Sequence, residues 1–242
     1  TTPLAGHQFR SLAVGTFVDD PVYTSQVVIA TQDVATGDGA FARSYMLSPT
    51  AGTWSFDTGN TPTYGAVDIA SGQFDDDNLD EYAMAIDVND DKWTEYGGRL
   101  RIGNGDDWEL ETNYIDGRYF TGVAVGQYDD DPYDEIAVST YSEADNFTGQ
   151  LVIYDHMGGY SQAGPIHESE KRFQEVFTDV ATGDYTLDGK SETYISTDVR
   201  PFRTEDPYPE GAKVYSQEYR YNQPPDNGTW EYFASGQERR CE

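Results

Sequence analysis

The chain has 242 residues, a formal net charge of −29 at pH 7 and a pI of about 4.1. Nucleic acid and anionic membrane surfaces are excluded as main partners, because both would repel so acidic a protein. No apolar stretch is long enough for a membrane helix and no signal-like segment precedes Thr1, so we expect a soluble chain from which any export signal has been removed.

The composition predicts an all-β chain with many turns. The sequence contains 24 glycines and 11 prolines, and 14% of its residues are aromatic. No segment repeats its apolar residues with the 3.6-residue period of a helix. The length suits one hydrophobic core, so we expect a single domain over residues 1–242.

Four similar segments follow one another along the chain. They begin at Gly15, Gly72, Gly126 and Gly183, at intervals of 57, 54 and 57 residues. The last three glycines open acidic stretches, such as Gly-Gln-Phe-Asp-Asp-Asp-Asn-Leu-Asp-Glu from residue 72, and the first opens a degenerate copy. This period predicts a propeller, solenoid or array. The approximate repeats are 8–62, 63–117, 118–174 and 175–242.

The third repeat shows its expected strands most clearly. Residues 121–128 and 135–141 alternate apolar with small or polar residues on either side of the acidic loop. Residues 149–155 form a third candidate strand, and a weaker fourth lies around Tyr160. In the other repeats, third strands start near Ala42, Gly98 and Ala212, and fourth strands hold Trp54, Trp108 and Trp230. Four units of four antiparallel strands predict a β-propeller.

Each unit resembles an FG-GAP/VCBS repeat, the blade of integrin α-subunit head propellers and of many secreted bacterial and fungal proteins. The likeness rests on the acidic stretches, which keep the phase of the family pattern Gly-Asp-Phe-Asn-Gly-Asp-Gly-x-x-Asp across nearly the whole chain. It implies four FG-GAP/VCBS-like blades with calcium in their loops, and an extracellular location, secreted or at the cell surface. Propellers of this family more often have additional blades, so the chain either closes alone or forms an arc of a larger propeller.

Alternate positions of the acidic loops suit calcium, which takes six to eight oxygen ligands at about 2.3–2.6 Å. Side chains at loop positions 1, 3, 5 and 9 are expected to face the ion, together with the backbone carbonyl of position 7. We therefore expect about three structural Ca²⁺ sites, with these ligands: Gln73, Asp75, Asp77, Leu79, Glu81, Gln127, Asp129, Asp131, Tyr133, Glu135, Asp184, Thr186, Asp188, Lys190 and Glu192. Bound calcium would neutralise the carboxylates and tie the first strand of a blade to the second.

Two loops depart from the family pattern. Gln73 and Gln127 replace the usual first Asp, which lowers the charge of the site, and Asn78 and Pro132 replace the turn glycine. Asn tolerates a left-handed turn whereas Pro does not, so the third loop is expected to bend differently. The other interpretation of all these loops is that they are solvated acidic hairpin ends without metal.

The first loop is expected to bind no metal. It places Thr16, Val18, Asp20 and Thr24 at the side-chain positions. One carboxylate is too little charge to hold calcium well.

The sequence predicts a binding site for glycan or protein and no catalytic site. No Gly-x-Ser-x-Gly, His-Glu-x-x-His, phosphate loop or nucleophilic cysteine arrangement occurs, so we expect no enzyme activity. Aromatic residues recur in the loops between second and third strands, at the opposite end from the acidic loops, and suit sugars or an extended peptide. These residues are Phe41, Trp93, Phe147, Phe202 and Tyr208. Their alternative role is to anchor the loops on their own blades.

The expected function is therefore a calcium-stabilised, non-catalytic binding or adhesion module that recognises a glycan or an extracellular protein. Two alternatives stay open. One is a structural subunit that self-assembles through unclosed blade edges into an extracellular assembly or filament, and the other is a polysaccharide lyase or hydrolase on a propeller scaffold. Asn146 and Asn227 lie in glycosylation sequons.

Overall fold

The computed structural model describes residues 7–19, 25–33, 41–48, 53–55, 64–89, 96–104, 107–113, 115–129, 131–155, 167–173, 175–199, 213–222, 229–233 and 239–240, and all structural statements concern these. Every regular element in these ranges is a strand, and the sheets are antiparallel. The prediction of an all-β chain is confirmed. No helix in the described ranges is long and apolar enough to cross a membrane.

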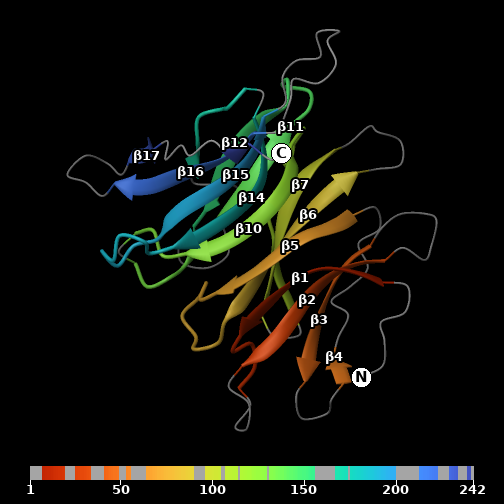
Figure 1. Ribbon diagram of the computed structural model, residues 1–242. Coiled ribbons are helices and arrows are strands. Elements are labelled where there is room, and N and C mark those ends of the chain that lie inside the picture. Colours follow the sequence, from red (N-terminus) through yellow and green to blue (C-terminus); the bar gives the residue numbers. More distant parts are fainter. Residues whose placement is uncertain are drawn as a thin grey trace.

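The strands form four sheets in which consecutive strands are hydrogen-bonded neighbours (Figure 1). The first sheet contains β1 (His7–Gly15), β2 (Gln26–Asp33), β3 (Phe41–Ser48) and β4 (Thr53–Ser55). The second contains β5 (Tyr64–Gly72), β6 (Glu81–Asn89), β7 (Tyr96–Asn104) and β8 (Asp107–Glu111), with β9 (Ile115–Asp116) also paired to β7. The third contains β10 (Tyr119–Gly126), β11 (Glu135–Ser142), β12 (Thr148–Tyr154) and β13 (His167–Glu168). The fourth contains β14 (Glu175–Gly183), β15 (Glu192–Val199), β16 (Lys213–Asn222) and β17 (Thr229–Phe233), with β18 (Arg239–Arg240) paired to β16.

The fourth strands only partly follow the sequence prediction. Trp54, Trp108 and Trp230 lie in β4, β8 and β17, as expected. Tyr160 lies outside the described residues, and the fourth strand described in the third sheet is the two-residue β13, paired with β12.

Each sheet begins with a strand that carries one irregularity at the same place. The register between first and second strands shifts once in every sheet, after Phe9, Ala66, Phe120 and Phe177. A bulge of this kind bends the strand and increases its twist. Because it recurs at one repeat position, it gives all four first strands a similar curvature.

The sheets stack face to face in chain order, and Figure 1 shows them following one another from the first sheet at lower right to the fourth at upper left. The first strands contact in succession, β1 with β5, β5 with β10 and β10 with β14. Among the described residues, no comparable contact joins β14 with β1. The described contacts therefore form an open series of four sheets, and closure into a ring stays a prediction.

Apolar side chains fill the space between consecutive sheets. In the first interface, Ala13, Val28 and Ala30 of the first sheet meet Ile69 and Met84 of the second. Two further clusters join the second sheet to the third and the third to the fourth. Fully burying a side chain of the size of Ile or Met contributes about 1.5–3 kcal/mol, so these clusters are the main source of cohesion between sheets.

The glycine before each of the first three loops lets the next sheet approach. A Cβ on Gly72 would lie 2.3 Å from Val125 Cγ1 and 2.8 Å from an oxygen of Asp134, which belong to the third sheet. A Cβ on Gly15 would similarly lie 2.9 Å from an oxygen of Asp80. A larger residue is excluded at these two positions, which explains this part of the sequence signal.

Neighbouring acidic loops are hydrogen-bonded to one another in a repeated way. A backbone N–H near the end of one loop donates to a carbonyl near the start of the preceding loop, in three pairs: Asp80 to Thr16 (2.9 Å), Asp134 to Gln73 (2.8 Å) and Ser191 to Gln127 (2.6 Å). The carboxylates of Asp80 and Asp134 also accept from the backbone N–H of Thr16 and Gln73, at 2.6 and 3.0 Å. The loops are thus held side by side.

Candidate metal-binding loops

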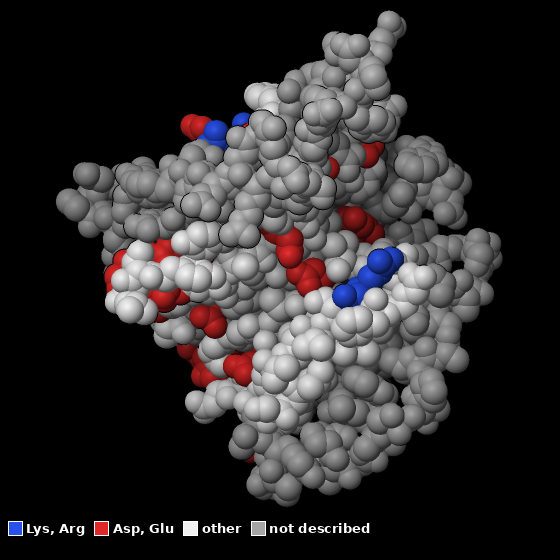
Figure 2. Space-filling view, in the orientation of Figure 1, with Lys and Arg blue, Asp and Glu red and all other residues white. Residues whose placement is uncertain are grey.

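The acidic loops connect the first and second strands of their sheets and lie at one end of the molecule. The strand pairs that flank them end on the partners Gly72 and Glu81, Gly126 and Glu135, and Gly183 and Glu192. Figure 1 places these loops in a row at lower left, and Figure 2 shows acidic side chains in red along the same edge.

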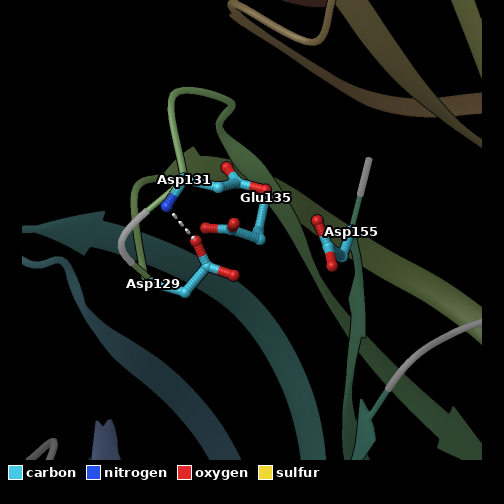
Figure 3. Close-up of side chains that lie close together, drawn as sticks. All are labelled: Asp129, Asp131, Glu135 and Asp155. Carbon is cyan, nitrogen blue, oxygen red and sulfur yellow. Dashed lines mark hydrogen bonds between the residues drawn. The ribbon is translucent and has the colours of Figure 1, made fainter. Parts of the chain in front are cut away.

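The third loop brings four carboxylates together. One oxygen from each of Asp129, Asp131, Glu135 and Asp155 lies within 4.8 Å of the others, and Figure 3 shows the side chains pointing toward one another. Asp155 follows the end of β12 and was missed by the sequence analysis. The register that pairs Ile136 with Tyr154 puts Asp155 opposite Glu135. Its signal was therefore its place directly after the third strand and not in the loop motif.

Glu135 is the innermost carboxylate of this cluster. It is 2% exposed, its Oε2 accepts a hydrogen bond from the backbone N–H of Tyr128 at 2.6 Å, and its Oε1 is buried with no hydrogen-bond donor. Burial, followed by the charges of Asp129, Asp155 and Asp131, raises the pKa of Glu135 to about 8. A divalent cation fits this environment, because it would supply the missing partner of Oε1 and offset the repulsion.

Side-chain to backbone hydrogen bonds shape the third loop. Asp129 Oδ1 accepts from the N–H of Asp131 at 2.8 Å, and Asp131 Oδ1 accepts from the N–H of Tyr133 at 2.8 Å. The second loop repeats both bonds, from Asp75 to Asp77 at 2.7 Å and from Asp77 to Leu79 at 2.6 Å. Pro132 thus leaves these two bonds unchanged, and the different bend expected of the third loop stays a prediction. Pro lacks only its own N–H, which this pattern does not use.

The second loop gathers three carboxylates: Asp75, Asp77 and Glu81. Glu81 is fully buried and its Oε2 accepts from the N–H of Phe74 at 2.6 Å, as Glu135 does from Tyr128. Asp75 is half-buried and Asp77 is exposed. This site therefore has the same internal glutamate with less charge around it.

Gln73 and Gln127 hold the loop backbone through their amide nitrogens. Gln127 Nε2 donates to the carbonyls of Asp131 and Tyr133, at 2.6 and 2.8 Å, and Gln73 Nε2 donates to those of Asp75 and Asp77. In this geometry the amide nitrogen of Gln127 faces the carbonyl of Tyr133, which was expected to be available to calcium. Rotation of the amide by half a turn exchanges nitrogen and oxygen, and the proposed role of both glutamines as oxygen ligands stays a prediction.

The fourth loop is more open. Asp184 and Asp188 are exposed, and only Glu192 of its three clustered carboxylates is buried. Thr186 donates through Oγ1 to Glu192 Oε1 at 2.7 Å, so this hydroxyl contacts the glutamate oxygen that corresponds to the one left without a donor in Glu135. Gly189 has a φ of 90°, which favours glycine at this turn position as the family pattern implies.

The first loop has an uncharged residue in place of the internal glutamate. Gln26 pairs with Gly15, is 2% exposed and accepts from the N–H of Phe17 at 2.7 Å through Oε1. The loop is therefore two residues longer than the spacing in the other repeats predicts, and Gln26 takes the place expected for Thr24. Thr24 and Asp20 lie outside the described residues. No acidic cluster is found among the described residues of this loop.

The aromatic residues expected to bind ligand are only partly described. Phe147 lies between β11 and β12, is half-buried and has a φ of 56°, and Phe41 begins β3 at the equivalent end of the first sheet. Trp93, Phe202 and Tyr208 lie outside the described residues. A shared aromatic surface therefore stays a prediction.

One of the two sequon asparagines lies among the described residues. Asn146 is exposed in a turn with a φ of 58°. Asn227 lies outside the described residues.

Comparisons with known proteins give no family. No family model matches the chain, and no curated protein matches it. Among solved structures, Drosophila Semaphorin 1a, extracellular domains 1–2, is similar at 8% sequence identity and a TM-score of 0.44, over 95% of this chain and 57% of that chain. The chain thus spans little more than half the length of that solved chain, and the FG-GAP/VCBS resemblance stays a prediction.

Proposed function

We propose that the chain is a calcium-stabilised, extracellular binding or adhesion module built from FG-GAP/VCBS-like propeller blades. The observation that carries this proposal is the recurrence of one arrangement in three loops, where two aspartates and a buried glutamate converge. A solvated acidic hairpin end has no reason to bury its glutamate beside other carboxylates, because burial of an uncompensated charge is costly.

The chemistry of the clusters favours calcium over other cations. Every side chain in the three groups is a carboxylate, without His or Cys, and hard oxygen ligands suit Ca²⁺ or Mg²⁺ better than transition metals. The ligands come from loop positions and adjoining strands, which suits the irregular coordination of calcium better than the strict octahedron of Mg²⁺.

The role proposed for the ions is structural. In the third loop, Asp129 and Asp131 lie between β10 and β11, Glu135 begins β11, and Asp155 follows β12. An ion held by these four side chains would link three strands of the sheet, so its binding free energy would add to the free energy of unfolding. The binding surface for a glycan or protein would then lie elsewhere, at the opposite end where Phe147 is found.

Calorimetric titration with calcium tests the metal part of this proposal. We expect saturable binding of calcium to the chelator-treated protein, a higher melting temperature in calcium, and much weaker binding of magnesium. Absence of calcium binding together with identical melting curves would refute it. A glycan array, probed with and without calcium, tests the ligand class: binding to a defined sugar supports a lectin-like module, and binding to no sugar redirects the proposal to a protein ligand.

A further inference from the structure

The four sheets use the same two surfaces to contact one another. In the first strand of each of the last three sheets, the residues three and six positions before the loop glycine face the preceding sheet. In the last three sheets these residues are buried, with exposures of 3% and 4% for Ala66 and Ile69, 1% and 4% for Phe120 and Val123, and 0% and 7% for Phe177 and Val180. They belong to the clusters that join each sheet to its predecessor.

In the first sheet the same positions are apolar but exposed. Phe9 and Leu12 are 59% and 51% exposed, and Val14 beside them on β1 is 55% exposed. We call these three residues the leading face. Its residues are apolar, like those buried between consecutive sheets, yet among the described residues no sheet covers them. Exposed apolar groups of this kind mark an interaction surface.

The fourth sheet presents the complementary surface, also open. In the first three sheets the aromatic residue two positions after the loop glycine is buried against the following sheet, with exposures of 0%, 1% and 1% for Phe17, Phe74 and Tyr128. Its equivalent in the fourth sheet, Tyr185, is 58% exposed, and Ala181 on β14 is exposed too.

A polar group completes this second surface. Asp68 of β5 accepts from its own neighbour Ile69 N–H at 2.9 Å through Oδ1, and from Val123 N–H of the following sheet at 3.0 Å through Oδ2. Asp179 holds the same position on β14 and accepts from Val180 N–H at 2.9 Å through Oδ1. We call Asp179, Ala181 and Tyr185 the trailing face.

We propose that the chain assembles head to tail, with the leading face of one copy docked on the trailing face of a second copy. The partner is a second copy because the contact would repeat the interface that joins consecutive sheets within the chain. In this contact Leu12 would take the place of Val123, and Asp179 the place of Asp68. Such a contact is heterologous, so it closes a ring of copies or extends into a filament. It uses sheet faces, not strand edges, and does not depend on the calcium proposal.

Paired charge substitutions test this assembly. Leu12→Glu blocks the leading face and Ala181→Glu blocks the trailing face, and both positions are exposed, so the variants should fold; circular dichroism and melting curves check this. Phe173→Glu, at a residue that is 64% exposed and outside both faces, is the matched control. In sedimentation velocity, we expect the wild type and the control to associate as concentration rises, and each face variant to remain monomeric.

Mixing the two face variants gives the sharpest result. Each retains the face that the other lacks, so the mixture should form one-to-one dimers and nothing larger. A wild type that stays monomeric at the highest concentration would overturn the proposal, as would association that survives Ala181→Glu. Calcium titrations of the same variants should match the wild type, so that failure of the assembly and failure of the metal sites are told apart.

Discussion

The third and fourth acidic loops are built on one plan and differ in how much charge they bury. Glu135 and Glu192 both begin the second strand of their sheets and accept a backbone N–H of the loop. In the third loop, half-buried Asp129 and Asp131 surround the glutamate, whereas in the fourth the two aspartates are exposed.

The third strand of the sheet increases the difference in charge between these two loops. The residue opposite the internal glutamate of the third sheet is Asp155, whose carboxylate joins the acidic group. The acidic group of the fourth loop contains only Asp184, Asp188 and Glu192 among the described residues. Affinity for calcium rises with the number of ligand charges, so the third site should be the strongest and the most dependent on its ion.

Replacing the internal glutamate should give the largest difference in melting temperature between variants of the two loops. In saturating calcium, Glu135→Gln should lose the stabilisation of one site, about 2.7 kcal/mol at a hundredfold excess over Kd, or about 5–10 °C in melting temperature for a chain of this size. In chelator the same variant should melt no lower than the wild type at pH 8, because a repelled buried charge has been removed. Melting curves in both conditions measure this.

Glu192→Gln is the matched control for that variant. Its loss of melting temperature in calcium should be smaller, because exposed carboxylates gain less from neutralisation. An equal loss in both variants would show that burial and the extra carboxylate do not set the order of the two sites.

The stabilising effect of calcium should depend on pH through the third loop. The pKa of Glu135 lies near 8 in the folded protein, above its ordinary value of 4.5, so the folded state holds the extra proton between these values. Without calcium, the stability due to this group is present below pH 4.5 and is lost as the pH rises through about 8. Calcium requires the deprotonated carboxylate, so the calcium-induced rise in melting temperature should grow across the same window. A dependence that persists in Glu135→Gln would assign it to other groups.

The sequence predicted the parts of the molecule that depend on local rules. The position of Glu81 and Glu135 followed from the loop phase, because the loop glycine and the first residue of the second strand pair directly. Gln26 was missed because a two-residue insertion leaves the glycine in place and shifts its partner.

The features that escaped prediction depend on contacts between distant strands. Asp155 lies 20 residues after Glu135, and only the pairing of β11 with β12 brings it to the loop. The short β13 has too few residues to show the alternation that identifies a strand. The two open faces were also missed, because Phe9 and Tyr185 have the same residue character as their buried equivalents, and their exposure is visible only once the order of the sheets is known.

Asp155→Asn should give the smallest effect, and one that tests the contribution of the third strand alone. The variant keeps the size and an oxygen ligand but removes one of the four charges, so we expect the affinity of the third site to fall by about tenfold, or about 1.4 kcal/mol. Because Asp155 is not part of the loop, the hydrogen bonds that the N–H groups of Asp131 and Tyr133 donate within the loop should survive. Asp116→Asn, at an exposed residue away from the loops, is the control for net charge. Calorimetry that shows equal affinity in Asp155→Asn and Asp116→Asn would place the third site within the loop alone and remove its advantage over the fourth.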